Sequence, residues 1–462
     1  MRSEAIQRSL IWVAVIALCV TTAGQVQGIE SKLPDDLAVQ SDEESPRQEF
    51  SRVKLVENVD LRDFGVWTGL RLGDLSGDGR LDFALGQNRG QNITCVTAMN
   101  AEGDVLWRVG KPNPEHYRTS FDLPIQIHDL DHDGQCEVVY AADGKLRVLN
   151  GKTGKLEKEA PLPAENANDC IIFADLKGRG YAGNVVVKTR YDKAWALNED
   201  FEVMWSFEGN TGHYPWPYDF DGDGCEELVC GYSLLEEDGT PKWRLDLPGH
   251  SDGTVTANVD GNAENGTEVG YATCGGNELV LVSEDGEVRW SQDVRHAQHL
   301  ITGDFRTDIP GLELAGLDRG NNRSASGEDY ILLLRHDGTP LWWQKRADKG
   351  KNRWISVITT VRDWDGREGD LILGYRRGGA TPPTLYDGHG RVVASFPFRN
   401  PEQQHFAQHA DIDGDGGAEI IVWDEKTICI YTNAAYESGS PAESPRRPNK
   451  LLYNYTHYIG MP

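Results

Sequence analysis

The chain has 462 residues, of which 39% are hydrophobic and 51 are glycine, and its formal net charge is −27 at pH 7. Nucleic-acid phosphates and anionic membrane surfaces repel so acidic a protein, which argues against both as partners. The glycine content and the lack of a long helical period favour one large all-β fold.

The N-terminus has the pattern of a secretory signal. Arg2 and Arg8 precede the apolar run Leu10–Val20, and small residues follow at Thr21 and Ala23, with a later alternative exit at Gly28. The run is too short for a comfortable membrane span. We therefore expect residues 1–28 to be a signal peptide, and the protein to be secreted or periplasmic without stable membrane insertion. The acidic, polar residues 29–50 are predicted to be a flexible lead-in.

Residues 51–435 are dominated by a repeated loop between two apolar runs. Four copies are nearly perfect and carry oxygen side chains at positions 1, 3, 5 and 9, with glycine at position 6. This is the ligand pattern of an EF-hand calcium loop, but strands replace the flanking helices. The predicted Ca²⁺ ligands are Asp74, Ser76, Asp78 and Asp82; Asp129, Asp131, Asp133 and Glu137; Asp219, Asp221, Asp223 and Glu227; and Asp411, Asp413, Asp415 and Glu419.

Four further copies of the loop are degenerate. They begin at Asp175, Asn258, Asp304 and Asp363, and the first contains Lys177 and Arg179, which could fill a vacated metal position. The eight copies recur about every 40 to 60 residues, the spacing of propeller blades. The sequence therefore predicts an eight-bladed β-propeller of four-stranded blades with Asp-rich calcium loops.

Each repeat also carries a hairpin turn followed by an aromatic residue. Asp-Gly turns precede Trp243, Trp290 and Trp342, which we interpret as core packing residues of an outer strand. A blade then consists of an inner strand, the Asp-rich loop, a second strand, a variable loop, a third strand, the Asp-Gly turn and the outer strand. Because a propeller hides its edges, Arg52–Asn58 is predicted to be the outer strand of the last blade. A linker (436–450) and a C-terminal tail (451–462) are expected after the ring.

Seven of the eight cysteines remain after the signal, and the sequence contains no CxxC zinc pattern and no HExxH motif. Cys136, Cys225, Cys230 and Cys274 lie in or beside second strands. We interpret them as small buried residues, because a propeller of this size does not need disulfides.

The predicted strand order separates the side chains into two sets. Asp-rich loops and Asp-Gly turns lie at one end of every blade, whereas the second-to-third loops and the blade connections lie at the other and are rich in Arg and His. In an acidic protein this clustering favours an anionic ligand, since Arg binds carboxylates in bidentate fashion. The predicted substrate-binding residues are Arg353, Arg376, Arg377, His213 and His296.

Two segments resemble a known family. Arg295–Glu313, with its His-containing strand, Gly-Asp-Phe and Pro-Gly-Leu-Glu, is similar to a stretch of the propeller-type rhamnogalacturonan lyases. Ala410–Trp423 resembles the last blade of those enzymes. The resemblance implies a secreted, eight-bladed, calcium-dependent enzyme that cleaves pectin backbones by β-elimination. The other loops equally suit FG-GAP propellers, many of which are not catalytic.

The resulting hypothesis is a secreted calcium-dependent polysaccharide lyase that acts on an acidic, uronate-containing, rhamnogalacturonan-like polymer. Elimination needs the uronate charge neutralised, a base at C5 and an acid for the leaving oxygen. His299 is the predicted base, and Tyr214 or His405 the predicted acid. The alternatives are a non-catalytic module binding extracellular glycan or protein, and a glycoside hydrolase that would need facing carboxylates such as Asp169 and Asp252.

Overall fold

The computed structural model describes residues 52–118, 122–320, 328–348, 356–366, 368–377, 381–398 and 404–436. The chain divides into two units, 1–35 and 36–462, and every described residue belongs to the second. The predicted signal peptide, lead-in and tail, almost all of the linker, and Arg353 lie outside the described residues.

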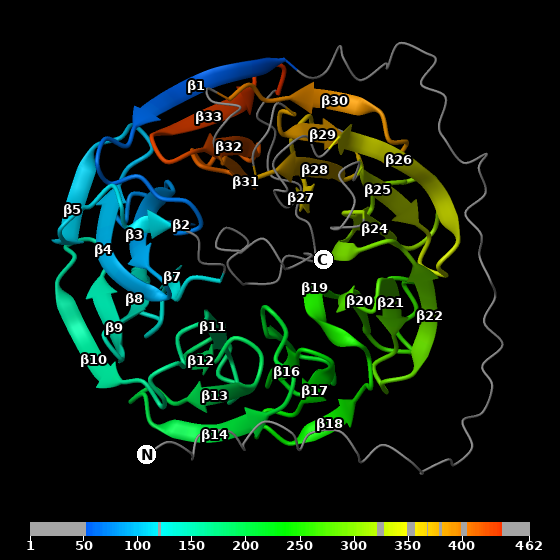
Figure 1. Ribbon diagram of the computed structural model, residues 1–462, viewed down its shortest axis with the longest axis horizontal. Helices are drawn as coiled ribbons and strands as arrows, with labels where there is room; N and C mark the ends of the chain where they lie inside the picture. Colours follow the sequence, from blue (N-terminus) through cyan, green and yellow to red (C-terminus); the bar gives the residue numbers. More distant parts are fainter. Residues whose placement is uncertain are drawn as a thin grey trace, which may run out of the picture. The chain divides into compact units, whose positions relative to one another are not determined.

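Eight antiparallel sheets follow one another around a closed ring, as Figure 1 shows. From inner to outer strand, blades 1 to 4 are β2 (Leu70–Gly73), β3 (Asp82–Arg89), β4 (Asn92–Met99) and β5 (Val105–Gly110); β7 (Ile125–His128), β8 (Glu137–Ala142), β9 (Lys145–Asn150) and β10 (Leu156–Pro161); β11 (Ile171–Ala174), β12 (Asn184–Lys188), β13 (Lys193–Leu197) and β14 (Val203–Glu208); and β15 (Trp216–Tyr218), β16 (Glu227–Cys230), β17 (Ser233–Leu235) and β18 (Pro241–Arg244).

In the same order, blades 5 to 8 are β19 (Gly249–Ala257), β20 (Glu268–Gly275), β21 (Glu278–Val282) and β22 (Val288–Asp293); β23 (Ala297–Gly303), β24 (Glu313–Asp318), β25 (Glu328–Leu334) and β26 (Pro340–Asp348); β27 (Ser356–Val361), β28 (Leu371–Arg376), β29 (Thr384–Tyr386) and β30 (Val392–Ser395); and β31 (Phe406–Ala410), β32 (Glu419–Trp423), β33 (Thr427–Asn433) and β1 (Val53–Asp60). The short β6 (Tyr117–Arg118) pairs with β3 in parallel.

The ring is closed by its two chain ends. The first strand, β1, pairs antiparallel with the last, β33, and becomes the outer strand of blade 8. This confirms both the eight four-stranded blades and the closing role predicted for Arg52–Asn58. No described residue belongs to a helix long and apolar enough to cross a membrane.

Neighbouring blades are joined by side chains of the outer strands. Trp205, Trp243 and Trp290 each donate their indole N–H to a backbone carbonyl in the third-to-fourth turn of the next blade, at 2.7–2.8 Å. Blade 2 has Lys158 at the equivalent position, and its ammonium lies 4.4 Å from the centre of the Phe201 ring. These tryptophans are therefore structural, in agreement with the sequence interpretation.

Glycine in these turns is required by the same packing. Gly286 has φ +83°, and an added Cβ would lie 2.7 Å from the ring of Trp243. Gly338 has φ +84° and stands equally close to Trp290. A side chain there would meet both backbone strain and a steric clash, so the Asp-Gly signal serves the contact between blades as well as the hairpin.

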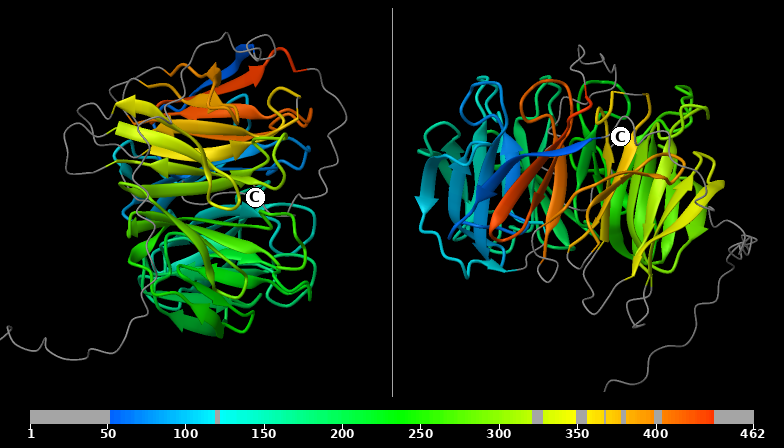
Figure 2. Two further views of the ribbon diagram at one scale, coloured as in Figure 1. Left: turned by 90° about the vertical axis from the view of Figure 1, so that its right-hand side faces the viewer. Right: turned by 90° about the horizontal axis from the view of Figure 1, so that it is seen from above.

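Antiparallel pairing places the loops of every blade at two ends of the ring (Figure 2). The first-to-second loops and third-to-fourth turns emerge at one end, which we call the aspartate end. The second-to-third loops and the blade connections emerge at the other, which we call the connecting end. The Asp-rich loops and the Arg/His set are thus separated by the length of a strand, as predicted.

Candidate functional site

A polar residue recurs at the connecting end of every blade. It lies six or seven residues before the first residue of the Asp-rich loop, where the inner strand begins, and it is buried in all eight blades. The eight residues are Thr68, Asp122, Asp169, His213, Asp252, Gln298, Ser356 and His405. Buried polar groups require partners. Those of blades 2, 4, 5 and 6 contact one another in turn, and Asp169 of blade 3 joins them through Arg190.

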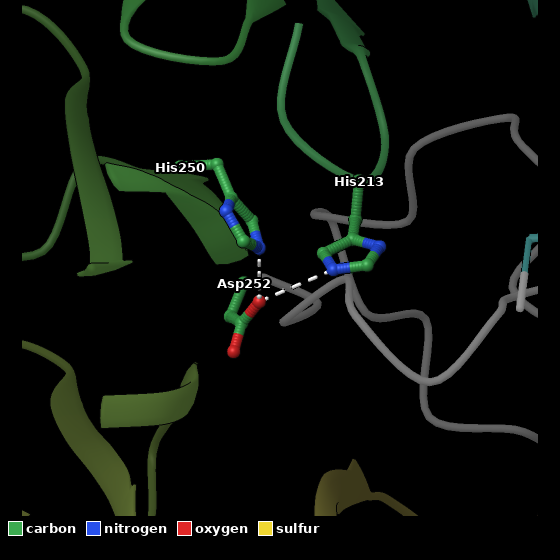
Figure 3. Close-up of side chains that lie close together, drawn as sticks. All are labelled: His213, His250 and Asp252. Atoms are coloured by element: carbon green, nitrogen blue, oxygen red, sulfur yellow. Dashed lines mark ion pairs between the residues drawn. The ribbon is translucent and has the colours of Figure 1, made fainter. Parts of the chain in front are cut away.

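Asp252 is the centre of this network. His213 Nε2 and His250 Nε2 lie 3.1 and 3.0 Å from Asp252 Oδ1 (Figure 3). Gln298 donates to Asp252 Oδ2 at 2.9 Å. Burial alone would raise the pKa of Asp252. The hydrogen bonds and positive charge of His213 and His250 outweigh it and hold that pKa well below the usual range. Asp252 is therefore a carboxylate surrounded by donors.

The strand geometry aims these two side chains. The pairing of β19 with β20 shifts register between Ser251 and Gly253, so Asp252 is the extra residue of a β-bulge. The pairing of β23 with β24 shifts in the same way between Ala297 and His299, around Gln298. A bulge turns one side chain away from the regular alternation of the strand. Here it directs both side chains into the network.

His213 is held from the other side by Asp122. Its Nδ1 lies 2.6 Å from Asp122 Oδ2, and its Nε2 lies 3.3 Å from the hydroxyl of Tyr191. Burial tends to lower the pKa of His213, but attraction to Asp122 and Asp252 dominates and raises it. The imidazole is thus fixed between two carboxylates, one from the connection into blade 2 and one from the start of blade 5.

The network continues into blade 3 through a buried ion pair. Lys188 Nζ lies 2.6 Å from Asp169 Oδ2, and both side chains are almost inaccessible to solvent. Arg190 lies 3.1 Å from Asp169 and 3.5 Å from Asp122, which connects this pair to His213. At the far end, Arg319 donates to the Gln298 side chain. Polar contacts therefore run without a break across blades 2 to 6.

Four members of the centre reach solvent. His250 has an exposed side-chain fraction of 25%, Arg190 of 38% and His296 of 13%. Tyr191 is half-buried, its ring packs 4.3 Å from that of His250, and the Arg190 guanidinium lies 5.0 Å from its ring centre. Burial raises the pKa of Tyr191 to about 12, against the opposing effect of Arg190. These groups are the ones that a ligand at the connecting end would meet.

The centre also has donor atoms suited to a metal ion. The ligand atoms of His213, His250 and Asp252 all lie within 4.8 Å of one another, and so do those of Asp252, Cys274 and His296. Burial raises the pKa of the Cys274 thiol to about 12. Imidazole, thiol and carboxylate together are typical ligands of zinc.

Of the five predicted substrate-binding residues, the structure brings His213 and His296 together at Asp252. Arg376 is buried and lies 3.1 Å from Asp329, and Arg377 is buried with its guanidinium 5.6 Å from the centre of the Phe406 ring. The fifth, Arg353, lies outside the described residues. The arginines next to Tyr191 and Gln298 are instead Arg190 and Arg319.

The three predicted acid–base residues are all buried, and each packs against different partners. His299 Nδ1 lies 3.2 Å from the Ile358 carbonyl, and burial lowers the pKa of His299 to about 3. Tyr214 packs in the apolar core between blades. His405 stacks on Phe398 with ring centres 3.9 Å apart, and burial lowers its pKa to about 3.

At the aspartate end, the intact loops share one turn. Asp219 accepts hydrogen bonds from the backbone of Gly222 and Gly224, and Glu227 accepts one from Phe220. The carboxylate oxygens of Asp219, Asp221 and Glu227 lie within 4.8 Å of one another, as do those of Asp129, Asp131 and Glu137. These oxygens fit a hard cation such as Ca²⁺.

The degenerate loop at Asp175 keeps the turn but not the oxygens. Its first carboxylate still accepts from the backbone of Arg179 and Gly180. Both cations of the loop pair with Glu199, with Lys177 Nζ at 3.1 Å and Arg179 beside it. The charge of Lys177 and Arg179 is thus balanced by Glu199, which lies in the third-to-fourth turn of the same blade.

Sequence reasoning overlooked Asp122, Lys188 and Gln298, and it assigned Cys274 no ligand role. Asp122, Gln298 and Asp252 share one position relative to the Asp-rich loops, so aligning the repeats would have selected them. Lys188 shares no such position, and only the fold shows that it meets Asp169.

The fold and parts of the sequence have known relatives, although no family model matches the chain. The chain is 23% identical over 342 residues to the rhamnogalacturonan endolyase YesW of Bacillus subtilis, covering 59% of this chain and 50% of that protein. It therefore spans about half the length of this curated relative. The resemblance to rhamnogalacturonan lyases noted in the sequence is thereby confirmed as a similarity.

Solved structures share the propeller. The exotype rhamnogalacturonan lyase YesX superposes with a TM-score of 0.60 and 17% identity, covering 85% of this chain and 80% of that one. The V. cholerae biofilm matrix protein Bap1 superposes with a TM-score of 0.62 and 15% identity, covering 88% and 94%. At these identities the likeness concerns the fold, which therefore carries both lyases and a matrix protein.

Proposed function

We propose that this protein is a polysaccharide lyase that cleaves an acidic, uronate-containing polymer of the rhamnogalacturonan type by β-elimination at the connecting end of the ring. One observation carries the proposal. Histidine, tyrosine and arginine side chains converge around Asp252 at a single place, in a fold and sequence similar to rhamnogalacturonan lyases. Function is assigned to the site, because the fold alone also serves other roles.

The chemistry needs three groups. The carboxylate of the uronate must be neutralised so that H5 becomes acidic, a base must take H5, and the oxygen leaving C4 must receive a proton. Arg190 and Arg319 are the cations beside the centre that would face the uronate carboxylate. Arginine suits this role because its fork of donors matches a carboxylate.

We assign proton transfer to Tyr191. Its hydroxyl lies 3.3 Å from His213 Nε2 and its ring lies next to Arg190, whose positive charge opposes the rise that burial causes in the pKa of Tyr191. A uronate polymer would meet this half-buried hydroxyl beside both groups. As phenolate it would take H5; as phenol it would return that proton to the C4 oxygen as the C4–O bond breaks. The products are a C4=C5 unsaturated uronate and a free hydroxyl, so atoms balance. His299, Tyr214 and His405 stay predictions, but their burial makes them less accessible to a polymer.

Calcium and secretion complete the proposal. The carboxylates of Asp129, Asp131 and Glu137, and of Asp219, Asp221 and Glu227, would hold structural Ca²⁺ at the aspartate end, away from the reaction. Residues 1–28 would direct the chain to a secreted or periplasmic location, where an acidic polysaccharide is available.

The test is incubation of the wild type with a panel of uronate polymers while ultraviolet absorbance reports the unsaturated product. We expect activity on a rhamnogalacturonan backbone, and little on a polymer whose carboxylates are esterified. Tyr191→Phe should lose at least about 10²-fold in turnover, the usual range for an acid–base group. Tyr181→Phe, near the degenerate loop of the aspartate end, is the matched control and should retain activity.

The second candidate is a non-catalytic module that binds extracellular glycan, as the shared fold of a biofilm matrix protein allows. Tight binding of a uronate polymer with no unsaturated product from any polymer would remove the lyase and leave this module. Absence of both binding and product would remove both functions.

A further inference from the structure

The donors around Asp252 differ in kind from those of the Asp-rich loops. The loop groups offer carboxylate oxygens only, whereas the groups around Asp252 offer three imidazoles and one thiol with a single carboxylate. Hard cations such as Ca²⁺ select oxygen, and imidazole and thiolate select zinc and its neighbours. The donor atoms at the two ends of the ring therefore suit different classes of ion.

The distances suit a small ion. His213 Nε2 and His250 Nε2 lie 3.1 and 3.0 Å from Asp252 Oδ1. Ligands at about 2.0–2.1 Å in a tetrahedral zinc site are roughly 3.3 Å apart. The three side chains shown in Figure 3 therefore need only a small outward movement to bind one ion in place of their hydrogen bonds.

A carboxylate behind His213 fixes the nitrogen that would face the ion. Asp122 Oδ2 accepts a hydrogen bond at 2.6 Å from His213 Nδ1, so the tautomer with that proton leaves Nε2 as the electron-pair donor. Metal-binding histidines commonly donate their other N–H to a carboxylate in this way. Asp122 is fully buried and therefore well held for the role.

Cys274 supplies the soft donor. It pairs directly with His250 across β19 and β20, and its Sγ lies within 4.8 Å of the ligand atoms of Asp252 and His296. His296 Nε2 lies 4.0 Å from Asp252 Oδ2, on the other side of the carboxylate from His213 and His250. None of the seven described cysteines is in a disulfide, and Cys274 is the one that lies among these histidines.

We propose that the Asp252 centre binds a transition-metal ion of the zinc class through His213, His250 and Asp252, with Cys274 as a thiolate ligand and His296 beside it. The ion is distinct from the calcium proposed for the aspartate end. Bound at the connecting end, it would add positive charge beside Tyr191 and Arg190, where an anionic ligand arrives. The proposal does not depend on lyase activity.

Cobalt provides a direct test. The full-length protein, stripped with chelator and dialysed, is titrated with Co²⁺ and Zn²⁺ in excess Ca²⁺. We expect one ion per chain and the intense near-ultraviolet charge-transfer band of a cobalt–thiolate bond. Cys274→Ser should abolish the band and weaken Zn²⁺ binding by at least about tenfold, comparable to the loss of other supporting groups at metal sites. Cys225→Ser, at the aspartate end, should change neither.

His250→Ala separates ligand loss from misfolding. It should weaken Zn²⁺ and Co²⁺ binding while near-ultraviolet circular dichroism stays that of the wild type. A wild type that binds Co²⁺ without a thiolate band, or Zn²⁺ affinity that is unchanged in Cys274→Ser, would overturn the proposal. Because no polymer is present, these results and the lyase assay can fail independently.

Discussion

The two ends of the ring differ in how closely their residues follow the sequence repeat. At the aspartate end, the loops at Asp129, Asp219 and Asp411 fold into the same turn, with the same backbone donors on the first carboxylate. At the connecting end, the polar residue at one position per blade varies among Thr, Asp, His, Gln and Ser, and those of blades 2 to 6 join into one network. The residues that repeat in every blade thus form the scaffold, whereas the residues that vary between blades form the candidate site.

The same contrast appears in how each end balances charge. The aspartate end is solvated and collects like charges, which a bound cation would offset. The connecting end buries its charges and pairs them internally, as Lys188 with Asp169 and His213 with Asp122 and Asp252. Removing a charge should therefore have different consequences at the two ends, and three predictions follow this difference.

The largest effect is expected at the buried pair. Asp169→Asn leaves the Lys188 ammonium buried without its 2.6 Å partner, which should cost about 3–5 kcal/mol of the free energy of unfolding whether or not Ca²⁺ is present. Chemical denaturation in chelator and in Ca²⁺ measures this. The double variant Asp169→Asn with Lys188→Met should recover most of the loss, since it removes both charges. A loss confined to Ca²⁺-containing buffer would contradict the contrast between the ends.

The sequence predicted the repeated features of the ring better than the residues that vary between blades. The eight blades and the packing role of Trp243 and Trp290 were predictable, because a periodic pattern records them many times. The closing strand was predictable because a propeller leaves no exposed sheet edge. The sequence predicted a candidate site at the connecting end but did not identify the network around Asp252. His213 and His296 lie there. Asp122 meets His213 across 91 residues of sequence, which no local pattern records, and Lys188 meets Asp169 only because β11 and β12 pair in blade 3.

The intermediate effect concerns calcium. Asp221→Ala removes an oxygen from an intact loop, whereas Asp175→Ala alters a loop whose cations already pair with Glu199. One site at a free Ca²⁺ level 100 times its Kd contributes about 2.7 kcal/mol, or roughly 3 °C for a ring of this size. Only Asp221→Ala should lose that Ca²⁺-dependent part of the Tm.

Both calcium variants are compared with and without chelator. Asp175→Ala also removes an acceptor of backbone hydrogen bonds, so its Tm falls equally in the two buffers. An equal loss of Ca²⁺ response in the two variants would show that intact and degenerate loops do not differ in metal binding.

The smallest effect, taken per pH unit, is a pH dependence of stability with opposite sign at the two ends. Burial lowers the pKa of His299 to about 3, so between about pH 6.5 and 3 the unfolded chain binds a proton that the folded chain does not, and stability falls as the pH falls. Burial raises the pKa of Glu313, in a degenerate loop, to about 7. The folded chain then holds the extra proton between about pH 4.5 and 7, and stability falls as the pH rises.

His299→Gln should therefore reduce the slope of the free energy of unfolding against pH below about pH 6.5. Glu313→Gln should reduce it between about pH 4.5 and 7. Each change of slope should be up to about 1.4 kcal/mol per pH unit. Urea denaturation in chelator from pH 4 to 8 measures both slopes, with the wild type as reference. Gln keeps a polar side chain at each site, so a parallel shift of the whole profile would report lost packing and only a change of slope would report the proton. A change of slope in the same direction in both variants would contradict the prediction. It would mean either that His299 is not buried as a neutral imidazole or that Glu313 is not buried as a protonated carboxyl.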